Sequence, residues 1–290
     1  MLLADYIHEL AARFEEANLS YSHGTDNAWD EAVFLCYGTL GIPFHQSLEE
    51  VDRELKQVEM ERLAELGERR LVECVPVAYL VGRTLFAGHE FLVDARALVP
   101  RSPVAELIGN DFSPLLKSPP ATVLDLCCGG GCIGIAIALQ FPEAKVVLAD
   151  LSEEALDLAR RNVALHNLED RVQIVQSDLF DGIEGCFDLI VSNPPYVGRL
   201  EYEQLPREFF HEPSLGLLSD EDGLAIPVAI LARATAFLRQ NGLLILEVGF
   251  SDEALQFRFP DFPFLWLDFE QGGAGVLAAD RSLLSQFEGN

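Results

Sequence analysis

Short apolar runs alternate with stretches of helical periodicity from about residue 120 onwards, and this alternation constrains the fold more than any other feature. Apolar runs bounded by glycine, proline or acidic residues are typical of strands buried on both faces. The predicted strands are 121–128, 145–150, 171–178, 187–196, 242–249, 264–270 and 274–280, with helices at 129–141, 152–167 and 222–239. The pattern therefore predicts an α/β fold with a doubly wound, mostly parallel, seven-stranded sheet.

The first third of the chain has a different pattern. Residues 3–17, 28–38 and 47–70 have helical periodicity with polar faces, and Asp26 or Asn27 is placed to cap the second of these helices. Two short strand-like segments around Gly88 predict a β-hairpin. We expect three parts: a helical domain at 1–72, a hairpin linker with a helix at 73–119, and the α/β domain at 120–290.

The net charge of the chain restricts the kinds of partner that it can bind. Lys and Arg number 20 against 47 Asp and Glu, a formal net charge of −27. A nucleic-acid-binding face needs clustered cations, so direct binding to nucleic acid is not expected. An acidic surface attracts a basic protein partner, although it can equally serve solubility alone. The apolar runs are too short to span a bilayer, and the acidic start lacks the basic region of a signal peptide, so we expect a cytoplasmic protein with no membrane contact.

A glycine-rich turn follows the first predicted strand. Asp125, Cys127, Cys128, Gly129 and Gly131 lie where that strand passes into a helix, and glycines there let the backbone approach a ligand closely. The spacing matches neither GxGxxG nor GxxxxGK[ST], which disfavours a dinucleotide or phosphate loop. The cysteines have no second pair at zinc-binding spacing, so we predict no metal site.

Two acidic residues end the next two strands. Asp150 follows the glycine turn by about twenty residues, where an acid can accept hydrogen bonds from ribose hydroxyls. The alternative is a cap for the following helix, whose N-cap is predicted to be Ser152. Asp178 ends the third strand and can accept from an adenine amino group, or it can be a solvated turn residue. Because ligands of such sheets bind at the carboxyl ends of the strands, both are candidate binding residues.

The sequence Asn193-Pro194-Pro195-Tyr196 ends the fourth strand and is the most informative motif. Two consecutive prolines remove two backbone donors and stiffen the chain, which is more than a simple strand end requires. The motif makes a rigid platform with two outward-facing acceptors, the Asn193 side-chain oxygen and the Pro194 carbonyl. Tyr196 adds a flat face for stacking. Such a platform suits a planar NH2 group.

These motifs together resemble the HemK-type family of protein glutamine methyltransferases. The family has a class I methyltransferase fold and a small N-terminal helical bundle joined to it by a β-hairpin. The resemblance covers nearly the whole chain and is carried by the glycine turn, Asp150, SDLF (177–180), NPPY (193–196) and LVPRSPVAEL (98–107). SHGTDNAWDEAV (22–33), AGHEFLVD (87–94) and HEPSLGL (211–217) indicate the branch that modifies large-subunit ribosomal protein L3. Release-factor-modifying members usually have PR-x-DTE where this chain has PRSP (100–103).

The resemblance implies a reaction and a set of site residues. It implies N5-methylation of a glutamine of L3, a basic protein, either free or in an assembling large subunit, with S-adenosylmethionine as cofactor. Cofactor contacts are implied for Asp125, Cys127, Cys128, Gly129, Gly131, Asp150, Asp178 and Asn193. Asn193 and Pro194 are the implied catalytic residues that hold the amide, with Pro195 and Tyr196 beside them. The family turn usually reads GTGSG, so the backbone contacts of Gly129 and Gly131 are expected to persist and the side-chain contacts to differ.

The acceptor pair suits this chemistry because an amide nitrogen is a poor nucleophile. Acceptors on both N–H bonds would fix the nitrogen and aim its lone pair at an already activated methyl group. The [DNS]PP[YFW] motif also occurs in methyltransferases that act on adenine or other amino groups of nucleic acid. That hypothesis predicts a basic face or a separate target-recognition domain. Two more hypotheses stay open, namely glutamine methylation of peptide release factors and a non-catalytic role in ribosome assembly.

Overall fold

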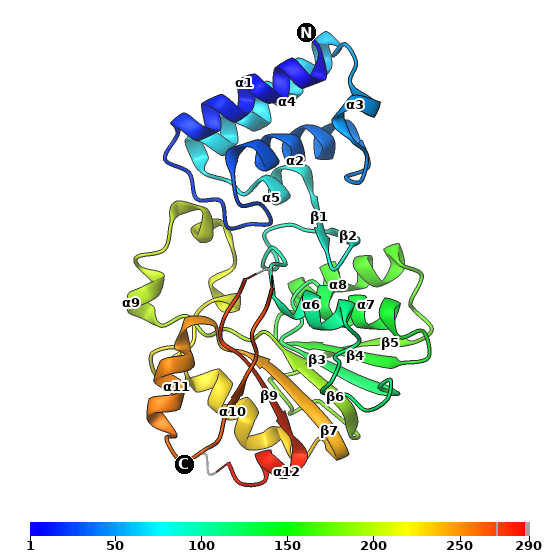
Figure 1. Ribbon diagram of the computed structural model, residues 1–290, viewed down its shortest axis with the longest axis vertical. Helices are drawn as coiled ribbons and strands as arrows, with labels where there is room; N and C mark the ends of the chain where they lie inside the picture. Colours follow the sequence, from blue (N-terminus) through cyan, green and yellow to red (C-terminus); the bar gives the residue numbers. More distant parts are fainter. Residues whose placement is uncertain (271, 288–290) are drawn as a thin grey trace.

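The computed structural model describes residues 1–270 and 272–287 and contains a seven-stranded sheet with helices on both faces (Figure 1). The strand order is β5-β4-β3-β6-β7-β9-β8; the pairings of β9 are antiparallel, whereas the rest are parallel. The strands are β3 (Thr122–Leu126), β4 (Lys145–Asp150), β5 (Val172–Gln176), β6 (Phe187–Ser192), β7 (Leu238–Glu247), β8 (Leu265–Trp266) and β9 (Val276–Asp280). The predicted doubly wound α/β sheet is confirmed. Its order reverses between β3 and β6, where a ligand crevice is expected.

Two apolar cores, one on each face, hold the sheet together. One contains the helices α6 (Val104–Gly109), α7 (Cys132–Gln140) and α8 (Glu153–Leu165), and the other contains α10 (Ala225–Ala234), α11 (Asp252–Arg258) and α12 (Arg281–Leu284). The sequence explains α7 well: it is apolar all round and lies buried between the sheet and the neighbouring helices. Ser152 caps α8 by accepting from the Ala155 amide, as predicted.

Helices of the N-terminal segment lie above the carboxyl ends of the sheet strands (Figure 1). They are α1 (Leu3–Glu16), α2 (Ala28–Leu40), α3 (Leu48–Val51), α4 (Gln57–Glu68), a π-helical turn η1 (Arg69–Glu73) and α5 (Val77–Val81). Their buried apolar side chains, among them Phe14, Leu35 and Leu63, form a core of their own. Asn27 is the N-cap of α2 and accepts from the Asp30 amide, which confirms that prediction.

The predicted continuous helix at 47–70 is wrong, because residues 52–56 are extended between α3 and α4. This stretch pairs with the start of the chain: the Leu3 amide donates to the Arg53 carbonyl, and the Leu55 amide donates to the Met1 carbonyl. Leu55 is buried there. The periodicity predicted the helices before and after this stretch correctly. Within the stretch, tertiary pairing overrides the helical preference.

The linker contains the predicted hairpin, with β1 (Arg83–Phe86) and β2 (His89–Leu92) turning at Gly88, whose φ is +78°. Some element ends differ from prediction. Strand β7 begins four residues early, at Leu238, and α10 ends at Ala234. The predicted strand 264–270 is reduced to Leu265–Trp266. None of the helices in the described ranges is long and apolar enough to cross a membrane.

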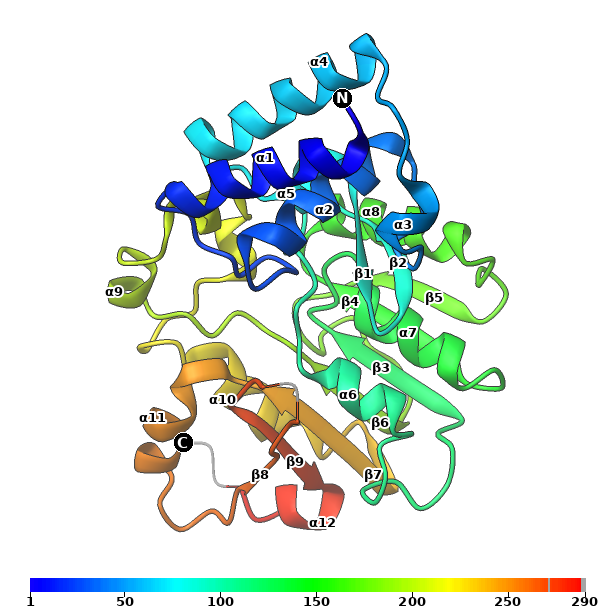
Figure 2. The same cartoon turned by 45° about the horizontal axis from the view of Figure 1, so that its top comes forward.

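A long connection between β6 and α10, residues 197–224, leaves the sheet and contacts the N-terminal helices; we call it the excursion. It contains α9 (Arg199–Tyr202) and the 3-10 turns η2 (Arg207–His211) and η3 (Ser214–Gly216). Figure 2 shows it rising from the sheet toward the lower end of α1. The later residues of the excursion return to the carboxyl ends of the strands. The excursion therefore connects the helical domain with that edge of the sheet.

Two buried ionic clusters hold the excursion in place. In the first, the fully buried guanidinium of Arg70 donates to Glu31 at 3.0 Å and to Glu208 of the excursion at 2.8 Å. In the second, Arg101 donates two hydrogen bonds to Glu212, of 2.6 and 2.7 Å. Burial opposes ionisation of Glu212, but Arg101 outweighs it and lowers the pKa to about 2. His23 Nε2 lies 3.4 Å from the same carboxylate.

Candidate active site

A cavity of about 470 Å³ lies at the carboxyl ends of β3, β4, β6 and β7, where the strand order reverses. Its size is within the range of small-molecule sites. Nine predicted site residues line it: Cys127, Cys128, Gly129, Asp150, Asp178, Asn193, Pro194, Pro195 and Tyr196. The sheet thus brings together side chains that are up to 69 positions apart in the sequence.

One half of the cavity is built around the glycine turn. Cys127 follows the end of β3 with a φ of +59°, and Gly129 has a φ of +54°. The Asp150 carboxylate accepts from the Gly129 amide and from the Ser152 amide, each at 2.8 Å. Burial raises the pKa of Asp150. Ser152 is the cap of the helix, so Asp150 does not have that role. Asp150 instead stabilises the turn and presents its remaining lone pairs to the cavity.

Asp125 and Gly131 lie behind the cavity wall. Neither is among the residues of the described ranges that line the cavity. Asp125 accepts from the Gly134 amide at 2.7 Å, and its Oδ1 has no hydrogen-bond partner within the described ranges. Gly131 has a φ of +80°, and a Cβ there would come within 2.8 Å of Leu148. Both residues therefore shape the turn from beneath, and the ligand contacts that the resemblance implies for them stay a prediction.

The buried Asp125 makes stability depend on pH in the ligand-free protein. Burial raises its pKa to about 7 from 3.8, so the folded state holds a proton that the unfolded state has lost between these values. Stability from this group is therefore lost as pH rises from 3.8 to 7. Urea unfolding at about pH 5.5 and pH 7.5 should show a decrease about 2 kcal/mol larger in the wild type than in Asp125→Asn. An equal decrease in both proteins would show that Asp125 ionises normally.

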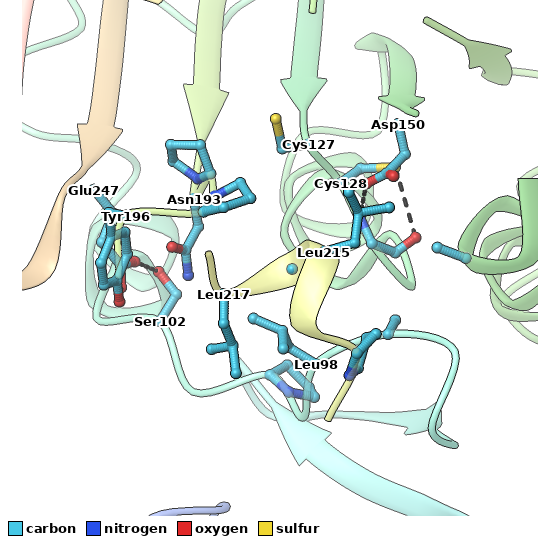
Figure 3. Close-up of a pocket in the computed structure, with 18 of the residues that line it drawn as sticks. Leu98, Ser102, Cys127, Cys128, Asp150, Asn193, Tyr196, Leu215, Leu217 and Glu247 are labelled. Carbon is cyan, nitrogen blue, oxygen red and sulfur yellow. Dashed lines mark hydrogen bonds between the residues drawn. The ribbon is translucent and has the colours of Figure 1, made fainter. Parts of the chain in front are cut away.

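The other half of the cavity holds the di-proline corner. Figure 3 shows the Asn193 carboxamide extending from the prolines into the cavity, with Tyr196 to one side of it. The Tyr196 ring lies against Gly249, where a Cβ would come within 2.4 Å of the ring. The Tyr196 carbonyl accepts from the Ser251 hydroxyl at 3.0 Å. The corner is therefore held from behind, and Asn193 remains directed at the cavity.

Glu247 and Ser102 also line the cavity, and neither was predicted from the sequence. Glu247 ends β7 and accepts from the Ser102 hydroxyl at 2.5 Å and from the Tyr196 hydroxyl at 3.1 Å. Burial raises the pKa of Glu247. The signal was present, since Glu247 is an acid at the carboxyl end of a strand, like Asp150 and Asp178. Ser102 has no such signal, because it comes from the linker and reaches Glu247 through the fold.

An apolar wall closes the side that faces the N-terminal domain. Leu98 of the linker and Leu215 and Leu217 of the excursion lie together across from the corner (Figure 3). The first residue of the excursion, which follows the corner directly, pairs with this wall: the Val197 amide donates to the Leu217 carbonyl at 2.8 Å. The cavity therefore has a polar end at the glycine turn and Asp150, a second polar end at the di-proline corner, and an apolar wall beside both.

Comparison with known proteins adds close relatives over nearly the full length. The chain is 41% identical over 278 residues to the ribosomal protein uL3 glutamine methyltransferase of Francisella tularensis subsp. tularensis (strain SCHU S4 / Schu 4), covering 95% of this chain and 88% of that one. It is 40% identical over 284 residues to the protein of the same name from Neisseria gonorrhoeae (strain ATCC 700825 / FA 1090), covering 97% and 95%.

The remaining comparisons concern the domain and the fold. Residues 112–224 match the model of the methyltransferase small domain. The hMettl16 catalytic domain, solved in complex with a MAT2A 3′UTR hairpin, superposes with a TM-score of 0.50 at 14% identity and covers 77% of this chain and 81% of its own. At that identity the likeness extends to the fold alone.

Proposed function

The chain belongs to the family of ribosomal protein uL3 glutamine methyltransferases, and from that premise we propose that it transfers a methyl group from S-adenosylmethionine to the side-chain nitrogen of a glutamine in uL3. One observation carries the proposal: the Asn193 carboxamide extends into the cavity whose other end is formed by Gly129 and Asp150. The two requirements of the reaction, an amide holder and an adenosyl site, thus share one cavity.

The residues of the polar end around Asp150 fit the cofactor. The wall at Gly129 and Gly130 has no side chains, which lets a flat nucleoside approach the backbone. Asp150 and Asp178 offer acceptors for ribose hydroxyls and for the adenine amino group. When bound, the cofactor supplies an electrophilic methyl group on a positively charged sulfur. The acidic side chains of the cavity complement that positive charge.

The opposite end fits the glutamine amide. The Asn193 side-chain oxygen and the Pro194 carbonyl would accept the two N–H bonds of the amide, which fixes the nitrogen and directs its lone pair. Tyr196, held by Glu247, would border the planar amide. No strong base is needed to form the new C–N bond, because alignment and the electrostatics of the site provide the catalysis.

A methyl-transfer assay tests the proposal. The enzyme, purified uL3 and S-adenosylmethionine with a labelled methyl group should yield labelled uL3, with the label on one glutamine by mass spectrometry. Free uL3 and immature large subunits should be compared as substrates. Label on RNA and never on protein would overturn the proposal. We further propose that the reaction occurs in the cytoplasm and that the N-terminal domain, residues 1–72, helps to dock the substrate.

Asp150→Ala should weaken cofactor binding by about 1–3 kcal/mol, the usual cost of losing a hydrogen bond to a charged group. Isothermal titration calorimetry with S-adenosylmethionine measures this directly. Asp157→Ala is the matched control, because Asp157 is an exposed acid on α8 that pairs with a surface arginine, Arg160. Equal affinities of the two variants would remove Asp150 from the binding site.

A further inference from the structure

An exposed aromatic side chain lies at the mouth of the cavity, at the end formed by the di-proline corner. Phe250 is 85% exposed and also lines the cavity. Its backbone lies beside the di-proline corner, because the preceding Gly249 has a φ of +50° and packs directly against the Tyr196 ring. Phe250 therefore follows immediately after the residue on which the di-proline corner rests, and it contributes little to the apolar cores of the protein.

Leu215 has the same two properties. It is 53% exposed and lines the cavity from η3, on the apolar wall across from Asn193 (Figure 3). Single exposed hydrophobic residues are ordinary on protein surfaces. Here, however, two of them border one opening, from elements that are more than thirty residues apart in the sequence. Apolar groups that stay exposed around a cavity are typical of surfaces that a partner covers.

The surroundings of these two residues are acidic. Residues 199–222 contain seven acidic side chains and two arginines. Two of the acids are buried in the ionic clusters described above, and one of the others, Glu201, lines the cavity. The exposed acids of this stretch are Glu201, Glu203, Asp220, Glu221 and Asp222. Glu221 pairs with Arg258, and the other four exposed acids still outnumber the two arginines of this stretch. This excess of negative charge favours a cationic segment as the partner and opposes a polyanion.

We infer that Phe250 and Leu215 form the docking site for an apolar side chain next to the target glutamine, on a substrate segment with basic flanking residues. The inference rests on the proposed function, since it describes how the glutamine of a protein substrate is presented to Asn193. Phe250 and Leu215 contact the apolar neighbour of the glutamine, and the acidic residues of the excursion attract the flanking cations. The glutamine side chain then enters the cavity between Phe250 and Leu215. A protein segment meets these demands, whereas nucleic-acid phosphates would be repelled.

Phe250→Ala tests the apolar contact, with Phe257→Ala as its matched control. Phe257 is 89% exposed on α11 and is not among the described residues that line the cavity, so both substitutions remove an exposed ring without disturbing a core. Binding of uL3 to the full chain loaded with S-adenosylhomocysteine should weaken about tenfold to thirtyfold in Phe250→Ala. Phe257→Ala should bind as the wild type does, and the affinity for S-adenosylmethionine should be the same in all three proteins.

Glu201→Lys tests the charge, with Glu184→Lys as its control. Glu184 is also exposed but lies in the loop before β6, at the opposite end of the strand from Asn193. Both variants change the net charge equally. At low salt, Glu201→Lys should slow the association of uL3 severalfold more than Glu184→Lys, and about 0.5 M NaCl should remove most of the difference.

The outcomes separate this inference from the proposed function. Methyl transfer to uL3 with equal binding by Phe250→Ala and Phe257→Ala would overturn the docking site and leave the function intact. Binding that depends on Phe250, without methyl transfer, would support docking and refute the function. Absence of both binding and transfer in the wild type would overturn both. Tighter binding of Glu201→Lys than of the wild type would also contradict the basic character of the partner.

Discussion

Replacement of Asn193 by alanine should lower kcat for glutamine methylation by about 10²- to 10³-fold, the effect typical of removing one preorganised polar contact from a reacting group. The substitution deletes the side-chain acceptor that extends into the cavity and leaves the Pro194 carbonyl as the remaining acceptor of the pair. With one N–H unrestrained, the amide can rotate and its lone pair is no longer directed at the methyl carbon. Single-turnover kinetics with saturating cofactor and uL3 measures the chemical step.

Asn193→Asp is the informative partner of this variant. Aspartate keeps an acceptor oxygen at the same place, so it should lose much less activity than alanine does. Cofactor affinity, measured by calorimetry, should change by no more than a few-fold in either variant, because the Gly129 turn and Asp150 are untouched. Full activity of Asn193→Ala would refute the amide-holding role, whatever the effect on cofactor binding.

Replacement of Arg70 by methionine should lower the free energy of unfolding by about 3–5 kcal/mol, because it leaves buried carboxylates without their cation. Arg70 is fully buried and joins Glu31 of α2 to Glu208 of the excursion, and it also donates to the Ser20 carbonyl at 2.9 Å. Even beside Arg70, burial raises the pKa of Glu31 to about 7. Removal of the guanidinium would make ionisation of this group still more costly.

Arg62→Met is the matched control for Arg70→Met in urea-unfolding measurements. Arg62 lies on α4 and pairs with Glu65 at the surface, where both side chains are more than half exposed, so its loss should cost under about 1 kcal/mol. Adding Glu31→Gln and Glu208→Gln to Arg70→Met should recover part of the lost stability, since neutral amides do not need the cation. Equal stability of Arg70→Met and Arg62→Met would show that the buried cluster does not stabilise the fold.

The sequence was sufficient to predict the features that depend on local pattern. Alternating apolar strands and helices indicated the doubly wound sheet, and parallel strands place their carboxyl ends on one edge. That geometry is why Asp150, Asp178 and Asn193 could be expected in one place, and all three line the cavity. The cap at Asn27 and the hairpin turn at Gly88 were likewise local, since each depends on a residue with a strong conformational preference.

What could not be predicted depends on contacts between distant segments. Glu208 is 138 residues from Arg70, and nothing in either neighbourhood indicates the other. Ser102 meets Glu247 across 145 residues for the same reason. The extended stretch at 52–56 follows from pairing with residues 1–3 rather than from its own composition. The contact between the Asp125 carboxyl and the Gly134 amide likewise became apparent only from the fold.

The two ionic clusters of the excursion have a consequence for engineering this enzyme. A chimera that receives its first 72 residues from a relative would inherit a new partner for Glu208, while the wall containing Leu215 and Leu217 would still come from the host. Exchange of substrate preference by swapping that domain alone should therefore fail unless residues 199–217 are transplanted with it. Residues 1–72 and 199–217 therefore form one unit for recombination, although they are far apart in the sequence.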